Sequence, residues 1–156
     1  MADSSAHGFD GLRLSHWRPQ RRDDGVLVLY FDRADAAVNA FSQDALIELG
    51  SALERIALDP PKALVIASGK AGGFIAGADL KEFQEFDRKG TVNDAIRRGQ
   101  DTFQRLAELP CPTVAAIHGF CMGGGTEISL ACTGRVASND PSTRIGLPEV
   151  KPGIYP

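Results

Sequence analysis

The sequence predicts an α/β domain with a mostly parallel sheet, and two patterns carry that prediction. Short apolar runs, such as Ala63 to Ser68 and Thr113 to His118, alternate with longer stretches whose apolar residues recur every three or four positions. Runs of the first kind are typical of strands covered on both faces, and stretches of the second kind are typical of amphipathic helices. Because strands and helices alternate, right-handed crossovers and parallel strands are expected.

The N-terminal part is predicted to begin with a leader and a hairpin. Residues 1–11 are rich in Asp, Ser and Gly and are expected to be a disordered leader, with the domain over residues 12–156. Leu12 to Trp17 and Val26 to Phe31 are predicted strands, joined by the polar turn Arg18 to Gly25.

The first long helix is expected to begin after Ser42, which is a good N-cap residue, and to end at Asp59-Pro60-Pro61. A short helix to about Phe86 follows the glycine turn at Gly77. The next helix is expected to start at a capping box formed by Thr91 and Asp94. Its apolar stripe is Ile96, Phe103 and Leu106. A helix over Gly124 to Cys132 and a strand over Arg135 to Ser138 complete the prediction.

Composition excludes several classes of protein. Hydrophobic residues make up 43% and charged residues 24% of the 156-residue chain, which is ordinary for one globular domain. The net charge of -3 provides no basic field for nucleic acid. No apolar run approaches the roughly 18 residues of a membrane span, and Met1 to Arg22 lacks a signal-peptide pattern, so a cytoplasmic location is expected.

The three cysteines form no C-x-x-C pair and are expected to be reduced thiols. Cys121 follows His118 by three residues, which leaves two interpretations: a nucleophile with its base, or a buried apolar thiol beside a strand-end histidine. The second is favoured. Two potential ligands do not make a metal site, so none is predicted.

The run from Ala115 to Glu127 carries the most chemistry. A strand leads into Gly123-Gly124-Gly125, and Glu127 follows two residues later. Glycines at a strand-to-helix junction leave backbone N–H groups free, and a helix start favours negative charge. Such a junction suits an oxygen that becomes negative during a reaction, with a carboxylate beside it to move protons. The alternative is a tight turn with an ordinary first-turn glutamate.

Two further segments favour the chemical interpretation. Gly72 to Lys81 is a second glycine-rich turn that follows an apolar strand, and Gly146 to Val150 contains a second carboxylate, Glu149. Two glycine-flanked N–H donors and two glutamates are what the stabilisation of an enolate and the movement of protons around it require. The alternative for each glutamate is a solvated surface side chain.

These residues resemble the crotonase superfamily, and specifically enoyl-CoA hydratases. Asn39-Ala40-Phe41, Ala76 to Asp79, the GGG-T-E run and Leu147 to Val150 occur in the order of that family. The resemblance is greatest to the hydratase domain that begins the α-subunit of bacterial fatty-acid oxidation complexes. Leu130 to Val136, with Asn139-Asp140-Pro141 after it, is similar to the anaerobic type of that subunit. The implied fold is the repeated ββα spiral of the crotonase (ClpP-like) class.

The resemblance implies specific roles. The N–H groups of Ala78 and Gly124 would stabilise the thioester oxyanion, Glu127 would activate water as general base, and Glu149 would protonate Cα as general acid. The helix dipole is expected to keep Glu127 ionised, and apolar neighbours are expected to keep Glu149 protonated.

By the same resemblance, the coenzyme A portion of the substrate would lie along Ala76, Ala78, Asp79, Leu80, Lys81 and Gly124. Lys70, Arg33 and Lys81 are candidates for its phosphates, although each also fits a solvated surface charge. No permanently bound cofactor is expected. In an α-subunit an NAD-binding dehydrogenase domain would follow Pro156, the partner would be a thiolase β-subunit, and homo-oligomers are also expected.

Lys151-Pro152-Gly153 and the chain end at Pro156 depart from the family pattern, which continues through helices that close the acyl pocket. The chain is therefore expected to be a fragment, weakly active or inactive alone, with an exposed apolar surface. Three alternatives to a hydratase stay open: an enoyl-CoA isomerase, a non-catalytic CoA-binding or oligomerisation module and, remotely, a glycosidase with paired carboxylates.

Overall fold

A computed structural model describes residues 8–34 and 36–150, which form two sheets with helices packed against them. The larger sheet has the strand order β1-β2-β3-β5-β7. Its strands are β1 (Trp17–Arg21), β2 (Val26–Phe31), β3 (Ala63–Ser68), β5 (Thr113–Ile117) and β7 (Gly134–Ala137). β1 runs antiparallel to β2, and the other neighbours are parallel. The predicted α/β class with a mostly parallel sheet is confirmed.

The N-terminal hairpin differs from the prediction. The first strand begins at Trp17, where the predicted strand Leu12 to Trp17 ends, so that placement was wrong. Trp17 starts β1 because it is buried, stacks on the Phe31 ring at 4.4 Å and donates from Nε1 to the Ala45 carbonyl at 2.8 Å. An edge strand has one free side and tolerates the polar residues that follow Trp17.

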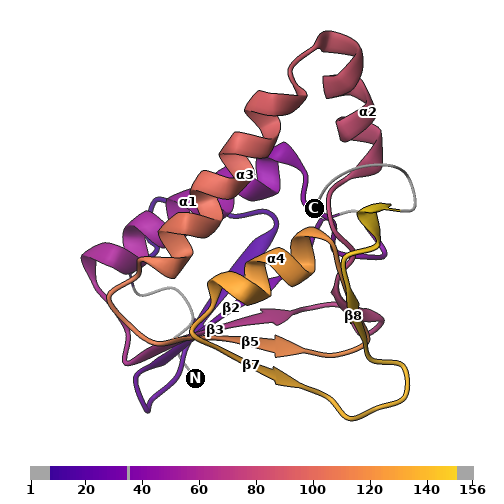
Figure 1. The fold of residues 1–156 in the computed structure, drawn as a ribbon. Coiled ribbons are helices and arrows are strands. Elements are labelled where there is room, and N and C mark those ends of the chain that lie inside the picture. Colours follow the sequence, from indigo (N-terminus) through magenta and orange to yellow (C-terminus); the bar gives the residue numbers. More distant parts are fainter. Residues whose placement is uncertain (1–7, 35, 151–156) are drawn as a thin grey trace.

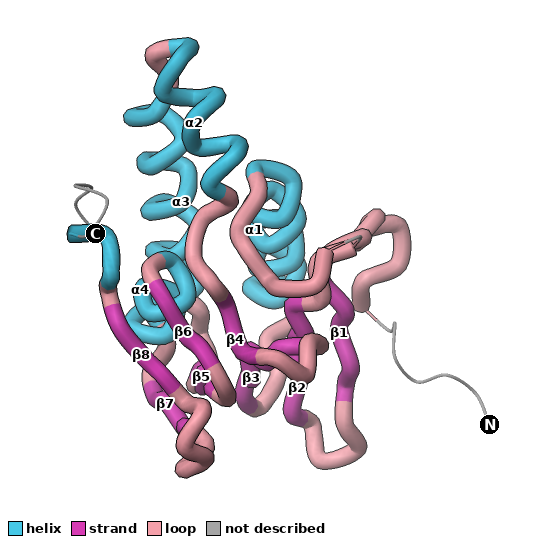
Figure 2. Tube along the Cα trace, turned by 90° about the vertical axis from the view of Figure 1, so that its right-hand side faces the viewer, coloured by secondary structure: helices cyan, strands magenta, loops and turns pink. Residues whose placement is uncertain are grey.

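A second sheet was not predicted. It contains three short parallel strands in the order β4-β6-β8, namely β4 (Gly73–Ile75), β6 (Phe120–Met122) and β8 (Arg144–Gly146). Figure 2 shows them side by side. Each has three residues, too few for a sequence period, and two of them contain glycine. Along the chain, a strand of the large sheet is followed by a strand of the small one and then by a helix, and this ββα order agrees with the expected spiral.

The helices are α1 (Gln43–Leu58), α2 (Leu80–Lys89), α3 (Val92–Ala107) and α4 (Gly124–Ala131), with a 3₁₀ turn at Pro148–Val150. The Ser42 side chain accepts from the Ala45 N–H at 3.2 Å, which confirms the predicted cap. α2 runs past Phe86 to Lys89, and Gly90, which caps its C-terminus, has a left-handed φ of 68°. The predicted capping box is wrong, because Thr91 makes no side-chain cap hydrogen bond.

The core lies between the large sheet and the helices, which cover one of its sides (Figure 1). An aromatic stack runs through this layer, with Phe31 between Trp17 and Phe41. Phe9 is also buried in it, which the prediction of a disordered leader over residues 1–11 did not anticipate. Residues 1–7 of that predicted leader, and the predicted departures at 151–156, lie outside the described residues.

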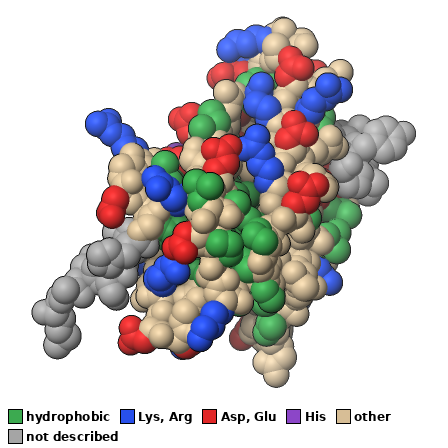
Figure 3. All heavy atoms as spheres, turned by 90° about the vertical axis from the view of Figure 1, so that its left-hand side faces the viewer, with side chains coloured by type: hydrophobic (Ala, Val, Ile, Leu, Met, Phe, Trp, Pro, Cys, Tyr) green, Lys and Arg blue, Asp and Glu red, His purple; other side chains and the backbone are tan. Residues whose placement is uncertain are grey.

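Charged side chains of both signs are interspersed with apolar ones on the face that Figure 3 shows. Along residues 8–34 and 36–150, no helix combines the length and the apolar character that a bilayer crossing needs.

Candidate active site

The turn after β4 holds the first predicted donor. Gly77 has a φ of 112°, which favours glycine, and its carbonyl accepts from the Phe41 N–H at 2.8 Å. The Asp79 N–H donates to the Phe41 carbonyl, also at 2.8 Å. These two bonds bracket Ala78 and use the groups on either side of it, so the Ala78 N–H points away from Phe41. No backbone carbonyl in the described part of the chain accepts from it.

The turn after β6 holds the second predicted donor. Gly123 has a φ of 50° and donates its N–H to the Gly146 carbonyl at 3.0 Å. Gly124 is the first residue of α4, where helix geometry leaves the N–H without an intrahelical acceptor. The Thr126 hydroxyl lies 2.9 Å from the Cys121 carbonyl and 2.8 Å from that of Gly146, and so links the turn to β6 and β8.

The two turns pack against each other. A Cβ added to Gly77 would lie 3.4 Å from the Met122 carbonyl oxygen and 3.7 Å from the Gly124 nitrogen. Residues that lie almost fifty positions apart in the chain therefore meet where β4 and β6 end. Both predicted donor peptides border this junction.

Both predicted glutamates reach the same junction. Glu127 lies in the first turn of α4, and its Oε2 is 3.7 Å from where a Cβ on Gly124 would be. Glu149 lies in the 3₁₀ turn, and its Oε1 occupies the place that a Cβ on Gly123 would take. Its Oε2 is buried and finds no hydrogen-bond partner among the residues described. Neither glutamate is therefore an isolated surface carboxylate.

The pKa of Glu127 is shifted in the direction opposite to the one that its place in the first turn of a helix favours. Burial, and then the nearby Glu149 carboxylate, raise the pKa of Glu127 above its ordinary value. The first-turn dipole that was expected to favour ionisation is worth about 0.3–1 kcal/mol at an exposed site and up to about 2 kcal/mol at a partly buried one. Loss of hydration and a like charge outweigh it here. The protonated state expected of Glu149 stays a prediction.

Five of the six residues expected along coenzyme A lie just before α2 or in its first turn, and the sixth, Gly124, begins α4. Ala76, Ala78, Leu80 and Lys81 are exposed there. Asp79 differs, because its carboxylate caps α2, accepting from the Lys81 N–H at 2.9 Å and the Glu82 N–H at 3.3 Å.

Two of the three phosphate candidates are engaged within the protein. The Arg33 guanidinium lies 2.7 Å from Asp79 Oδ2, and Lys70 Nζ lies 2.7 Å from Asp32 Oδ1. Arg33 and Lys70 are each only 20% exposed, so neither is the solvated surface charge that was the alternative interpretation. Lys81 remains exposed.

The sequence did not predict the structural roles of Asn39 and Phe41. Asn39 is fully buried, and its side-chain amide donates to the carbonyls of Phe31 at 2.7 Å and Phe74 at 3.2 Å. Phe41 forms the backbone bridge to Ala78, and its ring would lie 3.2 Å from a Cβ on Gly124. A buried asparagine gives no periodic signal, so only the resemblance pointed to this segment.

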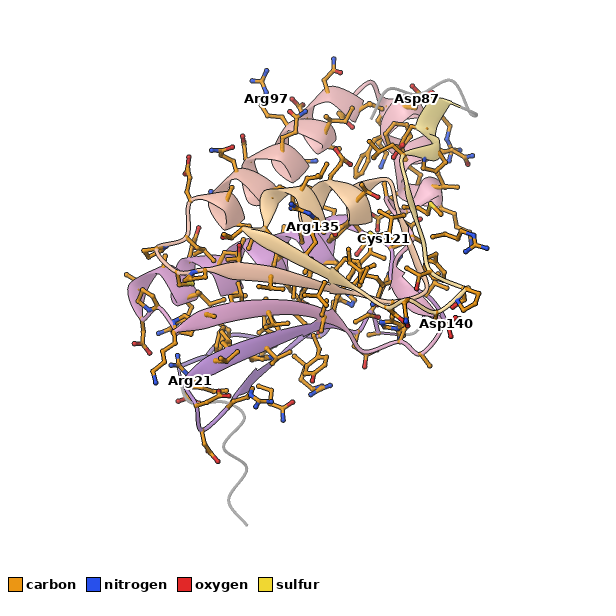
Figure 4. The ribbon with its side chains drawn as sticks, turned by 60° about the horizontal axis from the view of Figure 1, so that its bottom comes forward. Arg21, Asp87, Arg97, Cys121, Arg135 and Asp140 are labelled. Carbon is orange, nitrogen blue, oxygen red and sulfur yellow. The ribbon has the colours of Figure 1, made fainter. Side chains whose placement is uncertain are left out.

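The interpretation of Cys121 as a buried thiol is confirmed. Its Sγ lies 3.6 Å from the Ser129 hydroxyl, whereas His118 Nε2 contacts the Lys70 carbonyl at 2.8 Å. Figure 4 shows Cys121 within the body of the molecule, far from Asp87 and Arg97 on the projecting helices. Between residues 8 and 150, residue 35 apart, no cluster of three or more His, Cys, Asp or Glu side chains could hold a metal ion.

Comparisons with known structures identify this arrangement as a crotonase-type fold. A Pseudomonas aeruginosa structure titled DspI superposes with a TM-score of 0.85 at 29% identity, covering 95% of this chain and 55% of that one. An enoyl-CoA hydratase from Bacillus anthracis has a TM-score of 0.82 at 31% identity, covering 90% of this chain and 54% of that one. The chain thus spans about half the length of these structures.

Sequence comparison gives the family. The profile of the enoyl-CoA hydratase/isomerase family matches residues 21–156, and the chain belongs to that family. The α-subunit of a fatty acid oxidation complex from Idiomarina loihiensis is 40% identical over 136 residues, covering 86% of this chain. A Shewanella sp. (strain W3-18-1) α-subunit is 39% identical over 137 residues. The chain spans 19% of the length of each of these relatives.

Proposed function

We propose that this chain carries the hydratase site of fatty-acid β-oxidation, which adds water across the 2,3 double bond of a 2-enoyl-CoA to give a 3-hydroxyacyl-CoA. The observation that supports this most is the convergence of Glu127 and Glu149 on the Gly123–Gly124 turn, beside the Gly77–Ala78 turn. Family membership and the names of the relatives support a reaction of the hydratase/isomerase class on fatty-acid substrates, and within it we assign hydration, a lyase reaction.

In the proposed reaction, Glu127 accepts a proton from water as the water oxygen bonds to Cβ. Negative charge then moves to the thioester oxygen, where the N–H groups of Ala78 and Gly124 stabilise it. Each such donor is worth about 3–4 kcal/mol in comparable sites. Glu149, protonated at the start of the proposed cycle, delivers its proton to Cα and is left as a carboxylate. A proton that then passes from Glu127 to Glu149 through solvent restores both groups. The raised pKa of Glu127 supports the base role, because a base whose pKa lies nearer neutrality takes up a proton more readily.

We propose that the acyl-CoA thioester is bound as a substrate, with its adenine and pantetheine along the backbone from Ala76 to Lys81. Ala76, Ala78 and Leu80 in this segment are exposed, so a ligand can reach it. Lys81, at the end of this segment, is an exposed cation. No metal or permanently bound cofactor takes part in the proposed chemistry.

Membership in a larger assembly is also part of the proposal. The curated relatives are named as subunits of fatty acid oxidation complexes, and we propose a cytoplasmic complex with a thiolase β-subunit. Exposed apolar side chains at α4, β7 and β8 support association with further chains or with a second copy, because such side chains are common at interfaces. They are Leu130, Val136 and Ile145.

An enoyl-CoA isomerase is the second candidate, since the family name includes it. Moving a proton between carbons needs one carboxylate, and the presence of two at one junction favours hydration. A non-catalytic CoA-binding module is the third candidate.

The test is the loss of conjugated thioester absorbance of crotonyl-CoA, measured with the unmodified chain and with Glu127→Gln. Turnover that the substitution abolishes supports a hydratase with Glu127 in the mechanism. Full turnover in Glu127→Gln contradicts the assigned role. Calorimetric binding of crotonyl-CoA without turnover in the unmodified chain favours the non-catalytic module.

A further inference from the structure

A partly buried ion pair joins the end of β2 to the start of α2. Arg33 Nη1 lies 2.7 Å from Asp79 Oδ2, with side-chain exposures of only 20% and 16%. The same guanidinium donates to the Ala40 carbonyl at 3.3 Å, and the Arg33 N–H donates to Asn39 Oδ1 at 2.9 Å. By contrast, the ion pair between Arg105 and Glu54 has the same 2.7 Å separation, but its side chains are 53% and 67% exposed.

Asp79 makes more contacts than a helix cap needs. Its carboxylate accepts from two α2 N–H groups while it pairs with Arg33. Burial opposes ionisation of this carboxyl, yet the hydrogen bonds from Arg33, Glu82 and Lys81 outweigh it and hold its pKa below the usual value. The carboxylate therefore stays charged and paired at neutral pH.

These contacts converge on one peptide group. Ala78 lies between the two hydrogen bonds that Phe41 makes, one with the Gly77 carbonyl and one with the Asp79 N–H. Asn39 ties the Phe41 segment to the end of β2, at Phe31, and to the middle of β4, at Phe74. The Arg33 guanidinium contacts both sides of this arrangement, namely Ala40 beside Phe41 and the carboxylate beside Ala78. The turn that presents the Ala78 N–H is thus contacted on both sides by a residue from outside it.

We propose that Arg33 and Asp79 are positioning residues whose ion pair holds the Ala78 N–H in the direction that stabilises the oxyanion. The inference rests on the proposed function, in which that N–H is a donor. It assigns to Arg33 a task other than binding the phosphates of coenzyme A. The surroundings of the guanidinium support this, since it already has a carboxylate and a carbonyl as partners.

The test uses four variants of the full chain. Arg33→Gln removes the charge, and Arg33→Lys keeps it without the planar fork. Asp79→Asn removes the ion pair but keeps a residue type that caps helices well. Glu54→Gln removes the exposed pair with Arg105 and is the matched control.

Two readouts are taken for each variant. Amide hydrogen exchange by NMR at Phe41 and Asp79 reports the two bonds that bracket Ala78, and the amides of β3 report whether the sheet stays folded. Crotonyl-CoA hydration gives kcat and KM separately. The first readout does not depend on catalysis.

In Arg33→Gln and Asp79→Asn we expect exchange at Phe41 and Asp79 to accelerate about tenfold or more, with β3 unchanged. The value of kcat is expected to fall about tenfold to hundredfold at nearly constant KM, because small misplacements of a catalytic group have effects of this size. Arg33→Lys should recover part of the loss, and Glu54→Gln should match the unmodified chain in both readouts.

Several results would overturn the proposal. Unchanged exchange at Phe41 and Asp79 would show that the ion pair does not hold the turn. A raised KM with unchanged kcat in Arg33→Gln would assign Arg33 to phosphate binding instead. If the unmodified chain does not hydrate crotonyl-CoA, the proposed activity is absent from this chain alone, while the exchange data still decide whether the ion pair positions Ala78.

Discussion

Both donor turns lie between a short strand of the second sheet and a helix, but they are held in different ways. The Gly77–Asp79 turn is partly open to solvent and is held by polar groups from distant segments, chiefly Arg33 and Phe41. The Gly123–Glu127 turn is held by close packing: a Cβ on Gly125 would lie 2.5 Å from the Ile75 carbonyl oxygen. Removal of charge should therefore loosen the first turn, whereas added volume should displace the second.

The largest effect is expected at the packed turn, from chemistry rather than volume. Glu127→Gln keeps the shape of the side chain and removes the base, so kcat for crotonyl-CoA hydration should fall by about 10²–10⁴. The measurement is steady-state kinetics. The control variant is Glu108→Gln, because Glu108 is an exposed glutamate at the end of α3. Equal kcat in the two variants would show that the turn matters only as packing.

Gly125→Ala should destabilise the fold by about 1–3 kcal/mol, since extra volume in a packed site forces the backbone to move. The added Cβ would also meet the Ile75 Cβ at 2.8 Å. Urea denaturation gives the free energy of unfolding. Gly72→Ala is the matched control, because nothing lies within 4 Å of its Cβ position. A loss in Gly72→Ala as large as in Gly125→Ala would contradict the packing argument.

Ala78→Trp tests the open turn. The residue is exposed, so the ring fits without unfolding, but it would crowd the proposed thioester site. We expect kcat/KM to fall about tenfold or more, with little change in the free energy of unfolding. Ala57→Trp, at an exposed position on α1, should retain the activity of the unmodified chain. Undiminished kcat/KM in Ala78→Trp would remove Ala78 from the proposed site.

The smallest effects are expected in the pH dependence of stability, with opposite signs for the two turns. The pKa of Asp79 is below its ordinary 3.8, so its contribution is present above that pH and is lost as the pH falls through the folded-state pKa. The pKa of Glu127 is above its ordinary 4.5, so folding is penalised as the pH rises from 4.5 through the raised value.

Urea denaturation from pH 3 to 7 separates the two contributions. In Asp79→Asn, the free energy of unfolding should fall less at acid pH than it does in the unmodified chain. In Glu127→Gln, it should fall less as the pH rises above 4.5. Profiles of both variants that parallel the unmodified chain would show that neither carboxyl changes its affinity for protons on folding.

The long buried elements could be predicted because each carries its own signal. The β3 and β5 runs are apolar throughout, and α1 combines the Ser42 cap with a periodic stripe. The strands of the second sheet carry no such signal. β4 and β8 are short and contain glycine, and they become strands because β6 lies between them and pairs with both.

The candidate site divides in the same way. The glycine turns and both glutamates could be chosen from the sequence, because their residue types and their order along the chain are local facts. The pairing of Arg33 with Asp79 could not, and neither could the raised pKa of Glu127.

By itself, the sequence determined where the long buried strands, the Ser42 cap and the glycine turns form, and which groups are available for proton transfer. Only the tertiary structure decided that Glu127 and Glu149 share one junction, that the Arg33 guanidinium holds Asp79, and that burial outweighs the dipole of α4. The physical reason is that conformational preferences act between neighbours in the chain. Electrostatic energies depend instead on burial and on distances between residues that the fold alone brings together.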